Sequence, residues 1–430
     1  MKIVGKNGFV NSEGNFWILP LYLIAAGLDF RLSDIGVRGP NVNLLEFVTI
    51  LGLGKILLDA LVLPKQFSFM LNQLWKLMPV LVLYYSWIFV ASLIGLLVYP
   101  KSIFIVRNLF PAFVFSLFLV NCVRTPKQLR ILMYFFLISS LPNVLLGALQ
   151  YLMGKPYLVV LNMASAVKMD LDGSFVRNVA AGLYSHPNGL SIFLLPVVVI
   201  SAALSGMNLG QGVWGRVMAL LLFIISAVVL YGTRAKGAWL WSVFGLSLLL
   251  FPLWFYRIRN SSLLFVSILV SFIIGITLFS LDAGKTLSTM WTRVFLWNAA
   301  LNVFSHDIFL SFFGSAQLKM WYVSAKLADV QYDNAHNTFL NQMVNFGFFG
   351  LFFYLLNMLV SIKKACEIFY DKNAKDFFCF SKIAIAITLA ISGQYFFEPA
   401  AESSGYALTF VFFIAIPSLL QNMREGANEL

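Results

Sequence analysis

The sequence predicts an all-α polytopic membrane protein with about 12 transmembrane helices. Of its 430 residues, 60% are hydrophobic and only 11% are charged, and the mean hydropathy is +0.85. Soluble domains carry roughly 25% charged residues. A bilayer core about 30 Å thick requires about 20 apolar residues per helix, and apolar runs of this kind recur along the whole chain.

Apolar runs define the expected spans. They lie at 16–30, 42–63, 78–99, 103–121, 131–153, 189–207, 216–231, 238–255, 262–281, 339–361, 378–397 and 405–422. Most connections are short, whereas 282–338 predicts a large helical loop. No linker indicates a separate soluble domain, so we expect residues 1–430 to form a single integral membrane domain. The polar stretch 1–15 has no cleavage pattern of a signal peptide.

The basic residues predict an orientation. With a cytoplasmic N-terminus, 16 of the 30 Lys and Arg residues fall in cytoplasmic connections and 12 in outer ones, as the positive-inside rule favours. Cys122, Cys366 and Cys379 then lie on the reducing side, where thiols stay free. The loop 282–338 faces outward, which is the periplasmic side in a bacterial inner membrane.

The net charge of +12 is expected to serve topology and contact with anionic membrane lipids, and no nucleic acid partner is expected. The basic residues lie in short loops between spans, which is typical of membrane topology signals. The sequence has no zinc-ligand spacing, P-loop or dinucleotide fingerprint. We therefore expect no cofactor and no metal.

His336 is the first candidate for chemistry, because it lies where the long loop enters an apolar helix. An imidazole at a membrane boundary can act as a general base near neutral pH. Asp333 would share a helical face with it if the helix has already begun, and Asn337 offers a neutral hydrogen-bond partner. The alternative is a histidine that only caps or anchors the start of the helix.

The turn Tyr231-Gly232-Thr233-Arg234-Ala235-Lys236-Gly237 is a candidate anion site. Arg234 and Lys236 are flanked by glycines that let backbone N–H groups approach a ligand. The alternative is a pair of cations that extend to lipid headgroups.

Arg293 is the one charge in the stretch 291–301, whose apolar residues recur at helical spacing. This stretch predicts an amphipathic helix along the outer surface, with an interfacial anchor as the alternative to a site. His186 and Asn188 precede the sixth span and either line the same outer cavity or cap that helix.

Other charged residues have simpler interpretations. Lys55 and Asp59 are four residues apart and can neutralise each other. Arg107 can extend from its span to the membrane surface. Glu398 and Glu402, on the last outer loop, are able to contact sugar hydroxyls or an essential arginine.

These pieces together resemble the O-antigen ligase and polymerase family of bacterial envelope glycosyltransferases. The resemblance rests on Gly-x-Arg-x-x-Gly-x-Trp at 232–239, Arg-x-x-x-Trp-x-x-Ala at 293–300, and His-Asn-x-x-Leu at 336–340 followed by Gly-x-x-Gly-Leu at 347–351. It covers roughly residues 180–360. The chain departs from the family at 313–315, where Phe-Gly-Ser stands in place of Gly-x-Gly.

The resemblance implies a metal-independent glycosyltransferase of the GT-C type in the bacterial inner membrane. Its donor would be an undecaprenyl-diphosphate-linked glycan, and its site would face the periplasm. Arg234, Lys236 and Arg293 would hold the donor diphosphate, and His336 would deprotonate the acceptor hydroxyl. Asp333, Asn337, His186 and Asn188 would support them.

Several functions stay open at this point. Within the family, a ligase transfers glycan to lipid A-core in lipopolysaccharide biosynthesis, whereas a polysaccharide polymerase extends a lipid-linked glycan. Outside it, a transporter or flippase of lipid-linked sugars is the main alternative. Such a protein is expected to have internal repeats and a midplane charge pathway, and neither is visible in the sequence. A membrane scaffold would not explain polar residues gathered on one face.

Overall fold

The all-α prediction is confirmed for the described part of the chain. The computed structural model describes residues 15–28, 43–62, 64–98, 103–153, 179–184, 187–207, 209, 212–250, 293–302, 308–314, 335–371, 377–396, 398 and 404–428. Its helices are α2 (Ile18–Leu28), α3 (Leu44–Val62), α4 (Pro64–Leu77), α5 (Pro79–Val98), α6 (Ile103–Cys122), α7 (Pro126–Met153), α8 (Pro187–Gly206), α9 (Val213–Gly232), α10 (Lys236–Leu250), α13 (Ile308–Phe313), α15 (Thr338–Tyr370), α16 (Phe378–Tyr395) and α17 (Ser404–Asn428). Residues 293–302 are also helical.

The helices show that this is a membrane protein. Each predicted span coincides with a described helix, except 262–281, which lies outside the described residues. Within the described ranges, 6 helices are long and apolar enough to cross a membrane, or 7 if the bent pair α3 and α4 forms one span. α2 and parts of α5 and α6 are shorter apolar helices. The total of 12 spans stays a prediction.

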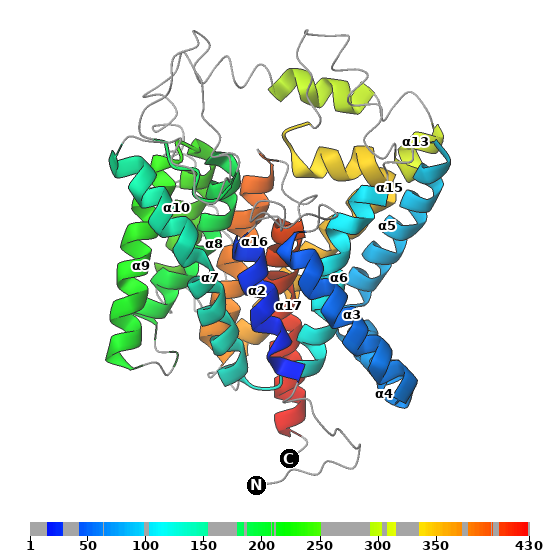
Figure 1. The fold of residues 1–430 in the computed structure, drawn as a ribbon, viewed down its shortest axis with the longest axis horizontal. Coiled ribbons are helices and arrows are strands. Elements are labelled where there is room, and N and C mark those ends of the chain that lie inside the picture. Colours follow the sequence, from blue (N-terminus) through cyan, green and yellow to red (C-terminus); the bar gives the residue numbers. More distant parts are fainter. Residues whose placement is uncertain are drawn as a thin grey trace.

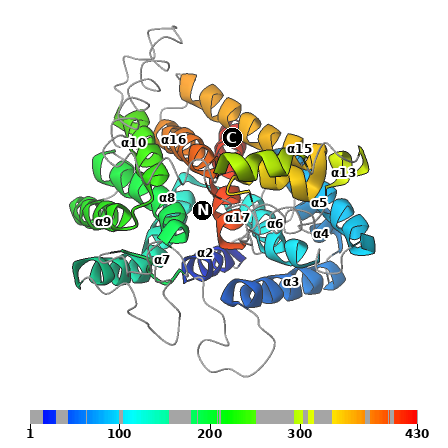
Figure 2. The ribbon, with the colours of Figure 1, turned by 90° about the horizontal axis from the view of Figure 1, so that it is seen from above.

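α17 is the centre of the bundle. About 94% of its most apolar stretch is buried, and it packs against α2, α6, α15 and α16 (Figure 2). The corresponding value for α9 is 22%, so α9 lies at the edge and presents most of its apolar surface outward. Three polar residues of α17, Ser404, Thr409 and Ser418, are buried inside the bundle.

The structure corrects the prediction for residues 64–77, which the sequence assigns to a connection between spans. They form α4, which begins at a proline, a residue favoured in the first turn of a helix. Met70, Leu74 and Leu77 are buried, whereas Trp75 and Lys76 are exposed. An amphipathic helix of 14 residues is too short and too polar to be recognised as a span, so the apolar-run criterion overlooks it.

α15 is broken at Gly347, which has φ 69° and ψ −168°. Figure 1 shows its first part lying across one end of the bundle, whereas the rest descends between other helices. A Cβ at Gly347 would lie 2.0 Å from the carbonyl oxygen of Phe312, and one at Gly314 would lie 2.3 Å from the carbonyl of Asn345. The two glycines therefore allow α13 and α15 to meet backbone to backbone.

The two ends of the bundle differ. Figure 1 places the start of α15 and the turn between α9 and α10 at one end, and the start of α2 and the end of α17 at the other. This arrangement gathers the sequence motifs at one end, here called the site end. Which end faces the cytoplasm stays a prediction.

Candidate active site

Glu398 joins three of the predicted site residues. Its Oε1 lies 3.0 Å from Nη2 of Arg293 and accepts a hydrogen bond of 2.8 Å from Nδ2 of Asn188. Its Oε2 lies 3.8 Å from Nδ1 of His336. The backbone carbonyl of Glu398 also accepts a hydrogen bond of 2.6 Å from Thr338 Oγ1. Segments between 60 and 210 positions away in sequence thus meet at one residue, and we call these residues the Glu398 cluster.

The cluster is electrostatically balanced around a buried anion. The Glu398 side chain is only 7% exposed, and Arg293 is 19% exposed. Burying a carboxylate is costly unless a partner compensates it, and the guanidinium provides that compensation. The separation of 3.8 Å from His336 exceeds hydrogen-bond range. The Nδ1 atom of His336 therefore faces the Glu398 carboxylate over a gap that a small movement would close.

The local structure shows which residue caps the start of α15. The helix cap belongs to its neighbour Asn337, whose side chain accepts a hydrogen bond of 3.1 Å from the backbone N–H of Leu340. α15 begins directly afterwards at Thr338, so the predicted helix start is confirmed. Asn337 therefore caps α15, whereas Nδ1 of His336 faces Glu398.

Arg234 and His336 share an unusual backbone. Their φ angles are 55° and 48°, and in the described ranges they are the only residues other than glycine with positive φ. A left-handed backbone costs a non-glycine residue about 1–2 kcal/mol. Such conformations persist where the surroundings enforce them and are frequent at functional sites. In each of the two sequence motifs, the left-handed backbone therefore occurs at the residue with a charged or titratable side chain, Arg234 in one and His336 in the other.

The turn after α9 is as tight as the sequence predicts. Its backbone is fixed by a hydrogen bond of 2.9 Å from Ala180 N to Gly232 O, and Trp239 Nε1 donates to Leu230 O at 2.8 Å. Arg234 is exposed, and Lys236 begins α10. The contacts that form the Glu398 cluster do not include this turn, although both lie at the site end (Figure 1).

The helix of residues 293–302 confirms the amphipathic helix predicted at 291–301. Leu296 is buried and Phe295 is 41% exposed, so one face packs and the other is open. Ala300 is buried with Ala335, the residue before His336. The helix thereby lies beside the start of α15 and brings its arginine to the cluster.

Asn188 joins the cluster through its hydrogen bond to Glu398. Two other predicted supporting residues, Asp333 and His186, lie outside the described residues. The sequence identified Glu398 as a possible contact for an arginine, yet it could not show that this carboxylate also faces an imidazole. That role depends on the packing of segments far apart in the chain.

Two of the charged pairs that lie away from the cluster involve residues considered in the sequence analysis. Lys55 pairs with Asp59, as the sequence predicts. Arg107 does not simply extend toward lipid, because its Nε and Nη2 each donate to Glu46 at 2.6 Å. In the part of the chain that the structure describes, no three His, Cys, Asp or Glu residues are placed to hold a metal ion.

The comparison with known families covers only some of the residues of this candidate site. The family model described as O-antigen ligase matches residues 221–355. This segment contains Arg234, Lys236, Arg293 and His336, but neither Asn188 nor Glu398. No curated protein matches the chain. Residues 221–355 of the chain are therefore similar to the O-antigen ligase family.

Proposed function

We propose that this membrane protein transfers a glycan from an undecaprenyl-diphosphate carrier to a sugar hydroxyl at the outer face of the bacterial inner membrane. The family match and the membrane helices indicate a membrane enzyme of glycan processing. The Glu398 cluster carries the more specific proposal, because it places a possible base beside a cation and a buried carboxylate.

His336 acts as the general base in this proposal. The acceptor oxygen attacks the anomeric carbon, its proton moves to the imidazole, and the bond between that carbon and the diphosphate oxygen breaks. Nδ1 faces Glu398, so the carboxylate would stabilise the imidazolium as it forms, and Nε2 would accept the proton. A general base contributes about 10²–10⁴ to a rate.

The cations at the site end bind the leaving group. Arg293 offers a planar fork with several donors, so it can keep Glu398 on one edge and hold a phosphate oxygen on another. Arg234 and Lys236 would contact the same diphosphate from the α9–α10 turn. Positive charge from side chains would then offset the negative charge that develops on the carrier, without need of a metal ion or nucleotide.

The two reactions within the family share this donor chemistry and differ in the acceptor. Ligation would transfer the glycan to lipid A-core, and polymerisation would join it to another lipid-linked glycan. The acceptor used by the purified protein therefore distinguishes them.

The test uses the full chain in proteoliposomes with lipid-linked glycan donor and each acceptor in turn. We expect His336→Ala to lower kcat by about 10²–10⁴ and Arg293→Ala to raise the donor KM. Arg107→Ala is the matched control, because it removes an arginine that is also paired with a glutamate. A His336→Ala enzyme with wild-type turnover would refute the proposal, and donor movement across the bilayer without a new glycosidic bond would indicate a flippase.

A further inference from the structure

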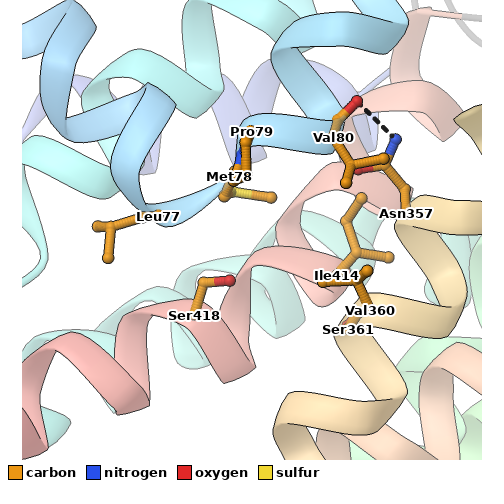
Figure 3. Close-up of a pocket in the computed structure, with 9 residues that line it drawn as sticks. All are labelled: Leu77, Met78, Pro79, Val80, Asn357, Val360, Ser361, Ile414 and Ser418. Carbon is orange, nitrogen blue, oxygen red and sulfur yellow. Dashed lines mark hydrogen bonds between the residues drawn. The ribbon is translucent and has the colours of Figure 1, made fainter.

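In the described part of the chain, four hydrogen bonds join α15 to α5 and to Leu77, the last residue of α4, and we call them the α5–α15 seam. Lys364 Nζ donates to Leu77 O at 2.8 Å, and Asn357 Nδ2 donates to Val80 O at 3.3 Å. Figure 3 shows the second of these bonds at the edge of a small cavity. The other two are Tyr84 OH to Gln342 Oε1, at 2.8 Å, and Trp87 Nε1 to Phe346 O, also at 2.8 Å.

The break at Gly347 divides this seam into two functional parts. Lys364 and Asn357 lie on the long part of α15 after the break. Gln342 and Phe346 lie on the short part before it, residues 338–346, which we call the arm. Tyr84 and Trp87 therefore hold the arm itself.

Trp87 acts at the break. A break in a helix disturbs the intrahelical bonding of the carbonyl groups beside it, so a side-chain donor there helps to fix the break. The indole N–H of Trp87 supplies one to Phe346. Its ring also stacks on Phe313, with centroids 5.5 Å apart, beside the contact between Gly314 and the arm. One side chain thus fixes the break from two directions.

The orientation of the arm decides where His336 lies. The arm has nine residues and is therefore about 14 Å long, with Gly347 at one end and Asn337 capping the other. A tilt of about 5° at the break would move the start of the arm by about 1 Å. A displacement of about 1 Å at a reacting group can cost about 10²-fold in rate. The gap between His336 and Glu398 is thus sensitive to contacts made on α5.

We propose that Tyr84 and Trp87 are positioning residues for His336. The inference rests on the proposed function, since it assumes that His336 carries the reaction. Both residues lie on α5, well before the segment 221–355 that matches the family. Neither contacts the Glu398 cluster directly. They would act by fixing the arm that carries the base.

The test compares Tyr84→Phe and Trp87→Phe with Asn357→Leu. Each of the first two removes a hydrogen bond to the arm, and we expect kcat to fall about 10-fold with little change in the donor KM. Asn357→Leu removes a seam bond beyond the break. We expect Asn357→Leu to lower Tm about as much as Tyr84→Phe and Trp87→Phe do, while leaving kcat unchanged.

A second readout follows the imidazole directly. The chain has three histidines, so NMR with ¹³C-labelled histidine gives few signals, and His336→Ala identifies the one from His336. That signal should shift in Tyr84→Phe and Trp87→Phe but not in Asn357→Leu. An unmoved signal together with wild-type kcat in Tyr84→Phe, which removes one hydroxyl only, overturns the inference. Full activity of His336→Ala would instead overturn the proposed function, and the NMR signals would still report on positioning.

Discussion

Replacing Glu398 with glutamine tests the cluster most directly, because the change removes one negative charge and keeps the shape of the side chain. Asn188 can still donate to the amide oxygen of Glu398→Gln. Arg293 loses its counter-charge, and His336 loses the carboxylate that faces its Nδ1.

The expected size of the effect follows from burial and distance. Breaking a fully buried ion pair costs about 3–5 kcal/mol. Arg293 is 19% exposed, so water replaces part of the interaction, and we expect a loss of about 2 kcal/mol in the free energy of unfolding. For the reaction, loss of an orienting partner typically costs about 10- to 100-fold, and we expect kcat to fall within that range.

The assay measures kcat, donor KM and Tm for Glu398→Gln in proteoliposomes. Glu46→Gln is the matched control, because Glu46 also pairs with an arginine, Arg107, but has no histidine partner among the described residues. It should lower Tm without lowering kcat. Wild-type kcat and Tm in Glu398→Gln would refute the reasoning. A lower donor KM with unchanged kcat would mean that the carboxylate competes with the donor diphosphate for Arg293.

Two further substitutions test the backbone. Gly347→Ala should destabilise the fold by at least about 3 kcal/mol, because its Cβ would meet the backbone of Phe312; the yield of folded protein and Tm measure this, and Gly54→Ala, where no atom lies within 4 Å of the new Cβ, should be tolerated. Arg234→Gly should keep or raise Tm, since it relieves a left-handed backbone worth about 1–2 kcal/mol, while the donor KM rises. A lower Tm with unchanged KM would contradict the assignment of Arg234 to donor binding.

The fold could be predicted from sequence wherever a single physical signal dominates. Long apolar runs located nearly all helices that the structure describes, because lipid exposure requires continuous apolar sequence. The search for long apolar runs did not identify α4, because the apolar residues of this helix cover only one of its faces. The break in α15 was equally hidden. Gly347 in the sequence is compatible with close packing or with a break, and only contact with Phe312 decides between them.

The site was predictable residue by residue, but its assembly was not. His336, Arg293 and Asn188 were identified from residue type and motif, and the structure brings all three to Glu398. Periodicity and spacing describe neighbours along a helix, whereas this cluster joins residues 105 and 210 positions apart. The proposed positioning role of Tyr84 and Trp87 could not be predicted from the sequence for the same reason, because their hydrogen-bond partners lie more than 250 positions away.

The position of Glu398 after the family-matched segment 221–355 has a consequence for biosynthesis. The ribosome completes Asn188, Arg293 and His336 long before it reaches this residue. Until α16 has been inserted, the guanidinium and imidazole lack the carboxylate that brings them together. A nascent or truncated chain that ends before Glu398 would therefore contain every motif of the family-matched segment and still lack an assembled cluster, so catalytic competence is expected to arise only after Glu398 has been added.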